Sequence, residues 1–367
     1  MQAIAVDPAA RRFGLVEHPA PQSSGSHDVE LRVLDVGVCG TDREIACFEY
    51  GSPPAGSPYL VIGHECLAEV TRVGSDTTGL ARGDLVVPMV REPCLQPRCR
   101  ACRAGRQDFC DTGEFTERGI RHRHGYMTEQ VIVEDRFLLP VPRALREIAV
   151  LIEPLTIAEK ALTQVDAVQA RLPWHEPGGP GTTLRPRALV LGAGPVGLLG
   201  AMALAARAYQ VFVYSREPVG GRKSSIVEAF GGSYLSAHDH ALSDLPALVG
   251  DLDVIYEATG ASRFAFQALS VLGPNGVFVF TGVPGRKGPV ELDTDRVMRD
   301  LVLRNQIVLG TVNAGHGAFE HAIRDLATFQ ARWPDAVGSL ITARHAPERY
   351  ADALAGGGIK HVIRFGA

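Results

Sequence analysis

The chain has 367 residues, of which 46% are hydrophobic and 21% are charged, and its formal net charge is −4. A chain of this length can bury the cores of two domains without disulfide support. The charge balance offers no basic face for nucleic acid, and the longest apolar run, VVPMV, is too short to cross a bilayer. The segment MQAIAVDPAARRF lacks the order of a signal peptide. We therefore expect a cytoplasmic protein that acts on a small molecule, without nucleic acid or membrane partners.

Short alternating strands, broken by glycine and proline, fill about the first 150 residues. Examples are VELRVLDVGV, HECLAEVTRVG and GYMTEQVIVED. This pattern predicts an antiparallel, partly barrel-like β domain. Helical spacing of apolar residues begins at Ala149 and ends at Pro173, where a linker rich in Gly and Pro follows, PWHEPGGPGTTLRP.

The next segment, RALVLGAGPVGLLGAMALAARAYQVFVYS, has the order of a buried strand, a glycine turn, an Ala-rich helix and a second strand. Further buried strands, DLDVIYEATG, GVFVFTG and QIVLGTV, are separated by helical segments as far as about residue 312. This alternation predicts α/β architecture with a doubly wound parallel sheet covered by helices. A helix, HGAFEHAIRDLATFQARW, and a last strand, KHVIRFG, complete the chain.

The glycine turn in LGAGPVG has the spacing G-x-G-x-x-G directly between a strand and a helix. The first glycine permits a tight turn, the second lets a pyrophosphate approach the backbone, and the third lets the helix pack near the strand. Free N–H groups at the helix N-terminus then attract the phosphates. The predicted dinucleotide-binding residues in this turn are Gly192, Gly194, Pro195, Val196 and Gly197.

The end of the second strand, VYSREP, distinguishes NADP from NAD. An acidic residue at this place accepts the ribose 2′-hydroxyl, whereas a basic residue accommodates a 2′-phosphate. Ser215 and Arg216 favour NADP, and Glu217 keeps NAD as the alternative.

Four of the chain's seven cysteines lie close together with the spacing C-x4-C-x2-C-x7-C, at Cys94, Cys99, Cys102 and Cys110. Four thiolates close a tetrahedral zinc shell and leave no position for a substrate, which is typical of a structural site. A chance set of free thiols, or a redox pair at CRAC, is the less favoured interpretation. We expect Cys99→Ser to destabilise the protein or its assembly before it alters the chemistry.

A catalytic zinc needs mixed ligands and one open position. The segments VCGTD, GHE and LIEPL supply Cys39, His64 with Glu65, and Glu153. Each of these is unspecific alone, since a lone Cys beside Gly is usually a small packed residue. The three segments together, in this order along the chain, form a specific pattern for a catalytic zinc site.

VCGTD, GHE, the four-cysteine lobe, EPL and LGAGPVG together resemble the zinc-dependent medium-chain dehydrogenases, over essentially the whole chain. FCDTGEFTERGI, HGYMTE, EPLTIAEKAL, YSREP and LGTVNAG are similar to the archaeal-type glucose 1-dehydrogenase branch. The resemblance implies a GroES-like β-barrel catalytic domain in residues 1–184 with a structural-zinc lobe at 94–110. It also implies a Rossmann domain in residues 185–312 and a return segment, 313–367, that completes the catalytic domain.

The same resemblance implies two zinc ions per chain and NAD(P)-linked oxidation of a sugar hydroxyl to a lactone, in which the catalytic zinc lowers the pKa of the reacting hydroxyl. The catalytic zinc would be surrounded by Cys39, His64 and Glu65, with Glu153 reaching it directly or through water. Thr41 would pass on the proton, and the residues expected at the sugar hydroxyls are Glu117, Glu153 and Asn313. A homodimer or homotetramer is implied as well.

Some positions depart from the family. The first two cysteines are separated by four residues where two are usual, Val90 precedes the lobe where some relatives have a polar sugar-binding residue, and Ile157 stands where an acidic residue can occur. A dehydrogenase of another polyol, cyclitol, sugar-derived intermediate or secondary alcohol is therefore the first alternative. A non-catalytic NADPH-binding protein is the distant one.

Other residues are expected to carry no chemistry. His122 and His124 are expected to be solvated, and Cys47 and Cys66 are expected to be packed.

Overall fold

The computed structural model describes residues 1–23, 25–174, 185–285 and 288–366. Most of the predicted linker, and the predicted domain limit at 184, fall within 175–184 and lie outside the described residues. The chain divides into two compact units. Unit 1 comprises Met1–Thr156, Asn313–Ala327 and Leu340–Ala367, and unit 2 comprises Ile157–Val312 and Thr328–Ser339.

This division differs from the predicted domain limits at two places. Helix α3 (Ile152–Gln169) begins in unit 1 and continues in unit 2, so the first limit falls after Thr156 and not near residue 184. Helix α9 (His316–Arg332) likewise changes unit, after Ala327. A continuous helix carries no sequence signal at the residue where its packing partners change, since its spacing of apolar residues is uninterrupted.

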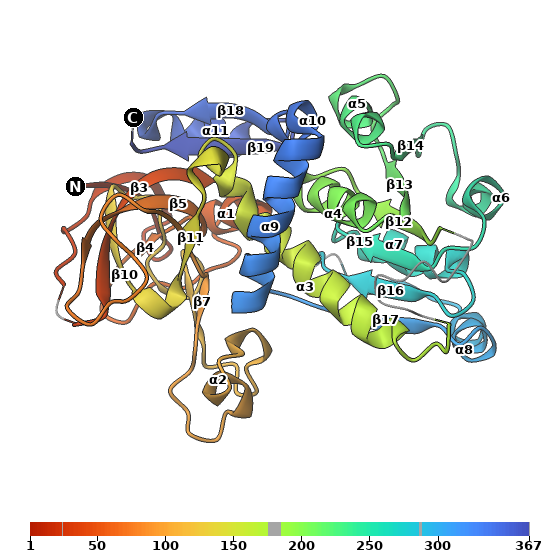
Figure 1. The fold of residues 1–367 in the computed structure, drawn as a ribbon, viewed down its shortest axis with the longest axis horizontal. Helices are drawn as coiled ribbons and strands as arrows, with labels where there is room; N and C mark the ends of the chain where they lie inside the picture. Colours follow the sequence, from red (N-terminus) through yellow and green to blue (C-terminus); the bar gives the residue numbers. More distant parts are fainter. Residues whose placement is uncertain (24, 175–184, 286–287, 367) are drawn as a thin grey trace. The chain divides into compact units, whose positions relative to one another are not determined.

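The main sheet of unit 1 has the strand order β11-β6-β5-β3-β19-β18, and β10 pairs with β3. These strands are β3 (Asp28–Gly37), β5 (Glu65–Val73), β6 (Leu85–Pro88), β10 (Gln130–Glu134), β11 (Leu138–Val141), β18 (Ile341–His345) and β19 (Lys360–Arg364). Val29, Leu31 and Val33 of β3 face the core and alternate with Glu30 and Arg32. The predicted β domain is thus confirmed, and its last strand comes from the C-terminal segment (Figure 1).

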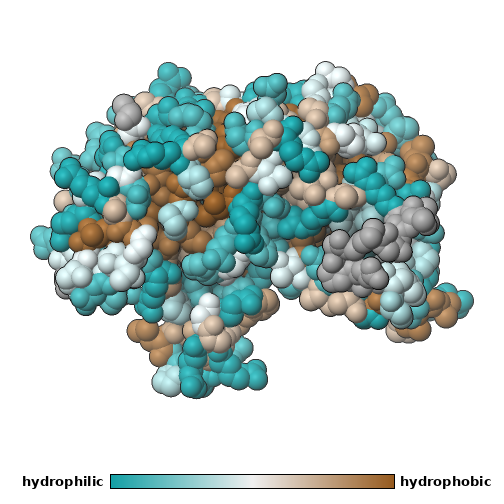
Figure 2. Space-filling model, viewed as in Figure 1, coloured by the Kyte–Doolittle hydropathy of each residue, from teal (hydrophilic) through white to brown (hydrophobic). Residues whose placement is uncertain are grey.

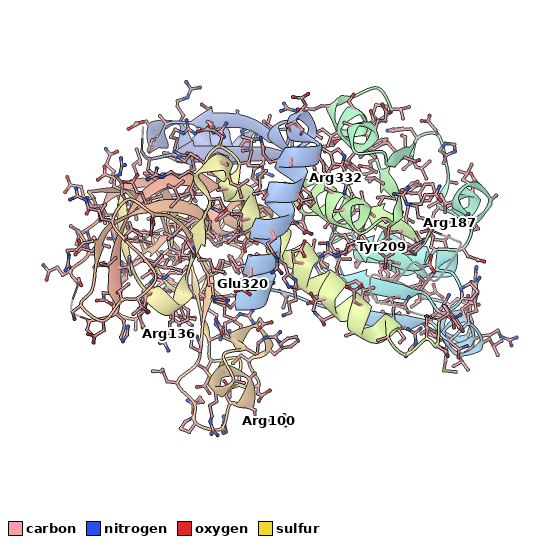
Figure 3. All side chains as sticks on the ribbon, viewed as in Figure 1. Arg100, Arg136, Arg187, Tyr209, Glu320 and Arg332 are labelled. Carbon is pink, nitrogen blue, oxygen red and sulfur yellow. The ribbon has the colours of Figure 1, made fainter. Side chains whose placement is uncertain are left out.

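Smaller sheets flank it. Strands β1 (Gln2–Asp7), β2 (Arg12–Glu17) and β4 (Leu60–Val61) form one of them, in the order β2-β1-β4. The other has the order β7-β8-β9 and consists of β7 (Arg91–Glu92), β8 (Thr116–Arg118) and β9 (His122–Arg123). Between β7 and β8 the chain forms the cysteine lobe, residues 94–110, which includes α2 (Arg100–Arg103) and the single turn η1 (Gln107–Phe109). Arg100, labelled in Figure 3, projects from α2 into solvent.

In the described part of unit 2, six parallel strands lie in the order β14-β13-β12-β15-β16-β17. They are β12 (Arg187–Leu191), β13 (Gln210–Ser215), β14 (Ser233–Ser236), β15 (Val254–Glu257), β16 (Val277–Phe280) and β17 (Ile307–Gly310). The connecting helices are α4 (Pro195–Ala206), α5 (Arg222–Ala229), α6 (Leu245–Val249), α7 (Ser262–Ala268) and α8 (Thr294–Leu303). The order reverses beside β12, as in a doubly wound dinucleotide-binding fold, so the predicted Rossmann sheet is confirmed.

The remaining helices are α1 (Gly40–Ala46), α10 (Pro334–Gly338) and α11 (Tyr350–Ala355). Single turns occur at η2 (Asp135–Phe137), η3 (Arg143–Leu145), η4 (Ala149–Leu151), η5 (Leu242–Asp244), η6 (Leu269–Val271) and η7 (Pro347–Arg349). None of the helices in the described residues combines the length and the hydropathy that a bilayer crossing requires.

Candidate active site

The predicted ligands of the catalytic zinc come together in unit 1. One donor atom each of Cys39, His64 and Glu65 lies within 4.8 Å of the other two. Cys39 precedes α1, and the carboxylate of Asp42 links the two segments: it accepts hydrogen bonds from Cys39 N at 2.8 Å and from Gly63 N at 3.2 Å. Asp42 is fully buried, so it fixes the start of α1 against the loop that carries His64.

His64 has the environment of a metal ligand. It is buried, its Nδ1 makes no hydrogen bond, and Asp42 Oδ1 lies 3.5 Å from that nitrogen. A carboxylate on the Nδ1 side of an imidazole leaves Nε2 as the nitrogen for a metal. Burial lowers the pKa of His64, but the charges of Asp42 and Cys39 outweigh it and raise that pKa well above its usual value. The donor set of one S, one N and one O suits zinc.

Glu65 is held by a lysine that the sequence analysis missed. Lys360 Nζ lies 2.7 Å from Oε1 and 2.6 Å from Oε2 of Glu65, and it also donates to Val38 O at 3.1 Å. Strand β3 lies between the two residues, and Gly37 of that strand leaves room for the carboxylate, since a Cβ there would lie 2.1 Å from Glu65 Oε2. The only sequence signal for this contact is a lysine within the apolar strand KHVIR.

Two other predicted catalytic residues lie outside the three-residue cluster. Glu153 is in the first turn of α3 and is partly buried. Burial raises the pKa of Glu153 to about 7, against the opposing effect of His64. Its carboxylate is thus near enough to the cluster to feel its charges, while direct or water-mediated ligation stays a prediction. Thr41 lies partly buried in the first turn of α1, and its proton-relay role also stays a prediction.

Two of the predicted sugar-binding residues contact each other. Asn313 Nδ2 donates to Glu117 Oε1 at 3.0 Å, although the two residues are 196 positions apart. Val90, beside β7, is buried with 3% of its surface exposed, and Ile157 is partly buried in α3. Neither supplies a polar group to a substrate.

The four cysteines of the lobe form a second cluster, with each Sγ within 4.8 Å of the other three. The Sγ atoms of Cys99 and Cys110 are 3.8 Å apart. This separation is far too long for a disulfide, whereas tetrahedral zinc with Zn–S bonds of about 2.3 Å places its sulfurs about 3.8 Å apart. Burial raises the pKa of the Cys110 thiol, but hydrogen bonds from Thr112 outweigh this effect and lower that pKa to about 6. A lowered pKa favours the thiolate, which is the form that binds a metal.

The predicted phosphate-binding turn connects β12 to α4. Gly192 has φ of +101°, and a Cβ on Gly197 would lie 2.1 Å from Gly192 O. Gly194 differs from both, because a Cβ there would meet no atom of the described residues within 4 Å. Since no protein atom explains the second glycine, the turn fits a ligand that approaches this position closely. Pro195 is the first residue of α4, and Val196 follows it, both partly buried.

The residues that follow β13 are consistent with the predicted NADP preference. Ser215 ends β13, and Arg216 is exposed. The Glu217 carboxylate forms an ion pair with Lys223, and Glu217 O accepts a hydrogen bond from Tyr234 Oη at 3.1 Å. The one acidic residue that favoured NAD therefore already has a cationic partner.

Two minor predictions were wrong and two are confirmed, one of which is that His122 is exposed. Cys66 is buried as expected, but Cys47 is exposed, because it lies at the solvent-facing end of α1. His124 is not solvated. It is half-buried, packs edge-on against His18 at 4.9 Å, and accepts a hydrogen bond from Val61 N at 3.1 Å.

Comparisons with known proteins agree with this geometry. Residues 146–365 match the family described as glucose dehydrogenase C-terminus, and residues 25–143 match the alcohol dehydrogenase GroES-like domain. Glucose 1-dehydrogenase of Methanocella arvoryzae is 38% identical over the full length of both chains. That of Thermoproteus tenax is 39% identical over 96% of this chain and 95% of its own.

A solved structure matches the full length as well. Glucose dehydrogenase of Haloferax mediterranei, in complex with NADP, Zn and gluconolactone, superposes with a TM-score of 0.88 at 31% identity, and all of both chains is covered. The residues, the fold and the relatives agree, and the chain belongs to the zinc-dependent medium-chain dehydrogenases, in the branch of the archaeal glucose 1-dehydrogenases.

Proposed function

We propose that this protein oxidises the anomeric hydroxyl of an aldose, with glucose as the first candidate, to the lactone, with NADP⁺ as the preferred hydride acceptor. The observation that carries the proposal is the presence, in one chain, of a clustered Cys39, His64 and Glu65 set and a G-x-G-x-x-G turn whose second glycine faces open space. The names of the full-length relatives support the substrate class. The Haloferax relative, solved with NADP, Zn and gluconolactone, supports the cofactors and the product.

In this proposal the metal ligands are Cys39, His64 and Glu65, with Glu153 close by. A zinc ion bound there would act as a Lewis acid and lower the pKa of the substrate hydroxyl, so that the alkoxide can form near neutral pH. Asp42 orients His64 through its Nδ1 side. Thr41 receives the proton of the hydroxyl and passes it toward solvent.

The cofactor residues have separate tasks. The turn Gly192 to Gly197 and the N-terminus of α4 bind the pyrophosphate. Ser215 and Arg216 bind the 2′-phosphate of NADP, and the ion pair of Glu217 with Lys223 removes the competing acceptor for a 2′-hydroxyl. Cys94, Cys99, Cys102 and Cys110 of the lobe would hold a second, structural zinc.

A substrate screen tests the proposal. Aldoses, polyols, cyclitols and secondary alcohols are each supplied with NADP⁺ and with NAD⁺, and metal content is measured on the same preparation. We expect glucose or a close epimer with NADP⁺ to give the highest kcat/KM, and two zinc ions per chain. Cys39→Ala and His64→Ala should lose one zinc and the activity, and full turnover in either variant would refute the site assignment.

A dehydrogenase of another polyol is the second candidate, because Val90 places an apolar, buried side chain where some relatives bind sugar. A polyol that exceeds all aldoses in kcat/KM would favour it. A protein with one zinc per chain and no oxidised substrate would favour a non-catalytic NADPH-binding role.

We also infer a homodimer or homotetramer that works in the cytoplasm. In the described part of unit 2, β17 is an edge strand, and its Val308 is exposed, as are Met298, Val302 and Leu303 of α8. Figure 2 shows hydrophobic surface in the region of α8. Apolar side chains beside an unpaired strand edge favour association with a second copy. Light scattering coupled to size exclusion tests the assembly, and a monomer at micromolar concentration would contradict it.

A further inference from the structure

The carboxylate of Glu117 is held on one oxygen and open on the other. Oε1 accepts hydrogen bonds from Arg91 Nε at 3.1 Å, from Arg91 Nη2 at 3.0 Å and from Asn313 Nδ2 at 3.0 Å. Among the described residues, no group donates to Oε2. A carboxylate oxygen in this state is a ready acceptor for a substrate hydroxyl, and its direction is set by the three bonds on its partner oxygen.

Arg91 has little freedom to move. Its side chain is 7% exposed and that of Glu117 is 9% exposed. The guanidinium carbon lies 3.7 Å from the centre of the Phe115 ring, and Nη1 donates to Asp108 O at 3.5 Å. A planar guanidinium stacked on a ring and bonded at its edge fixes a carboxylate more strictly than a lysine ammonium does.

Asn313 is held as firmly. Its φ is +58°, in the left-handed region that Asn adopts more readily than most residues. Its Oδ1 accepts a hydrogen bond from Ala314 N at 2.8 Å, and its Nδ2 donates to Glu117. We therefore expect the Asn313 amide mainly to orient Glu117, and only in second place to contact the sugar directly.

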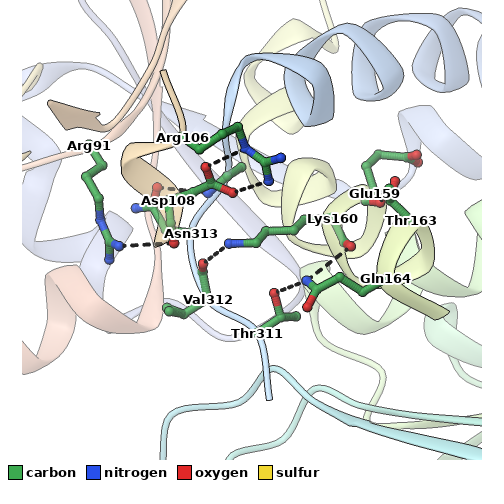
Figure 4. Close-up of polar contacts among 11 residues, drawn as sticks. Arg91, Arg106, Asp108, Glu159, Lys160, Thr163, Gln164, Thr311, Val312 and Asn313 are labelled. Carbon is green, nitrogen blue, oxygen red and sulfur yellow. Dashed lines mark hydrogen bonds and ion pairs between the residues drawn. The ribbon is translucent and has the colours of Figure 1, made fainter. Parts of the chain in front are cut away.

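The cysteine lobe supports both partners of Glu117 (Figure 4). Gln107 Nε2 in η1 donates to Arg91 O at 3.3 Å, and the neighbouring Asp108 carbonyl accepts from the Arg91 guanidinium. Asp108 also packs against the Asn313 segment, because a Cβ on Gly315 would lie 2.8 Å from Asp108 Oδ1. Arg106 holds the Asp108 carboxylate with bonds of 3.0 Å and 2.9 Å.

We propose that Arg91 is a positioning residue for sugar binding and that the lobe, residues 94–110, sets sugar affinity through Gln107 and Asp108. The inference rests on the proposed function, since it takes Glu117 as a sugar contact. The lobe is then more than a stabilising element. Cys94, Cys99, Cys102 and Cys110 would hold the zinc of the lobe. Gln107 and Asp108 of η1 contact Arg91 and the Asn313 segment, and these two direct Glu117.

Steady-state kinetics of the zinc-loaded enzyme with glucose and NADP⁺ test the role of Arg91. Arg91→Gln should raise KM for glucose about tenfold or more, the loss expected for a charge-assisted hydrogen-bond pair, with kcat and KM for NADP⁺ within about threefold. Arg91→Lys keeps the charge and should recover part of the affinity. Arg121→Gln is the matched control, because Arg121 lies over the same Phe115 ring, at 5.0 Å, without a bond to the Glu117 carboxylate.

A readout of selectivity separates positioning from general stability. The wild-type enzyme should discriminate glucose from whichever of its 2-, 3-, 4- and 6-deoxy analogues lacks the hydroxyl that Glu117 binds. Arg91→Gln should lose most of the discrimination against that one analogue. Its discrimination against the other three deoxy analogues should stay at the wild-type level. If Arg91→Gln fails to fold because Glu117 is left buried without a cation, Arg91→Lys carries the same test, since it keeps the charge beside Glu117 but lacks the planar guanidinium that donates from two nitrogens.

A second pair of variants tests the lobe. Gln107→Leu should raise KM for glucose about threefold or more while the zinc content stays at the wild-type value. Arg100→Ala, on the exposed end of the lobe, should leave KM unchanged. Wild-type KM and deoxy-sugar discrimination in Arg91→Gln would overturn the inference, as would equal losses in kcat and in both KM values. A wild-type protein that oxidises no aldose would instead overturn the proposed function.

Discussion

The ion pair of Lys360 with Glu65 offers a measurable test of how the active site is built. The two side chains are 2% and 1% exposed, and the three ammonium protons of Lys360 are matched by Glu65 Oε1, Glu65 Oε2 and Val38 O. Burial lowers the pKa of Lys360, but the charges of Glu65 and Cys39 raise it above its usual value, so the lysine is charged. Lys360→Met removes the cation with little change in side-chain volume.

The cost follows from what the substitution leaves behind. Removing one partner of a buried ion pair costs about 3–5 kcal/mol, since the other charge stays buried. The Val38 carbonyl also loses its donor, which adds about 1 kcal/mol. We therefore expect the free energy of unfolding of unit 1 to fall by about 5 kcal/mol. Lys360→Met/Glu65→Gln, which removes both charges, should recover about half of that loss.

Amide hydrogen exchange read by mass spectrometry measures this change where it occurs. Peptides that contain β3 and β19 report on the site, and peptides from β12 and β13 of unit 2 serve as the internal reference. Arg364→Met is the matched control on β19, because Asp35 keeps its bond to Arg146 when Arg364 is removed. That variant should lose about 1 kcal/mol or less. A loss below about 1 kcal/mol in Lys360→Met would refute the reasoning from burial and charge.

Three further predictions concern the cofactor and pH. Gly194→Ala should keep the melting temperature within about 2 °C but weaken NADPH binding at least tenfold by fluorescence titration, whereas Gly197→Ala should unfold more readily because its Cβ meets Gly192 O. If both bind NADPH normally, the turn is not the phosphate site. Arg216→Gln should raise KM for NADP⁺ about tenfold and leave KM for NAD⁺ unchanged, and an equal effect on both would remove Arg216 from the 2′-phosphate site. Burial is the main reason why the pKa of His124 falls from 6.5 to about 4, so protonation of this side chain opposes folding. Stability should fall as pH drops from 6.5 to 4, by less than about 1.4 kcal/mol per pH unit because the side chain is half exposed. His124→Asn, which keeps an acceptor for the backbone, should flatten that part of the urea-denaturation profile, and an unchanged slope would contradict it.

Features encoded by local spacing could be predicted from the sequence. The glycine turn and the four cysteines each lie within seventeen residues or fewer, so the chain places them together with little help from the rest of the fold. The alternation of apolar and polar residues likewise identified the β domain, and continuous apolar strands separated by helical segments identified the parallel sheet. Cys39, His64 and Glu65 are not connected by one local spacing. They were predicted as zinc ligands from the resemblance to a family.

Features that depend on pairing between distant strands could not be predicted. Lys360 lies 295 positions from Glu65, and only the strand order β5-β3-β19 brings them together. Arg91 was overlooked for a different reason. A surface arginine and a buried arginine look the same in one sequence, and the stacking on Phe115 that identifies this one appears only once β7 and β8 have paired.

The carboxylates of Glu65 and Glu117 differ in which of their oxygens are already bonded, and this difference leads to a last prediction. Glu65 has both oxygens on Lys360, whereas Glu117 keeps Oε2 open. A metal ligand that must give up a buried ammonium binds more weakly than one that gives up only a proton or water. Zinc retention should therefore depend on Cys39 and His64 far more than on Glu65.

Glu65→Gln tests this order. It should keep most of the catalytic zinc by elemental analysis after dialysis, although the buried Lys360 then lacks its counter-charge and the protein loses stability. His64→Ala, in the same dialysis, should retain only the zinc of the lobe. Equal loss of zinc in both variants would mean that Glu65 contributes as much to zinc retention as His64 does, in spite of its bonds to Lys360.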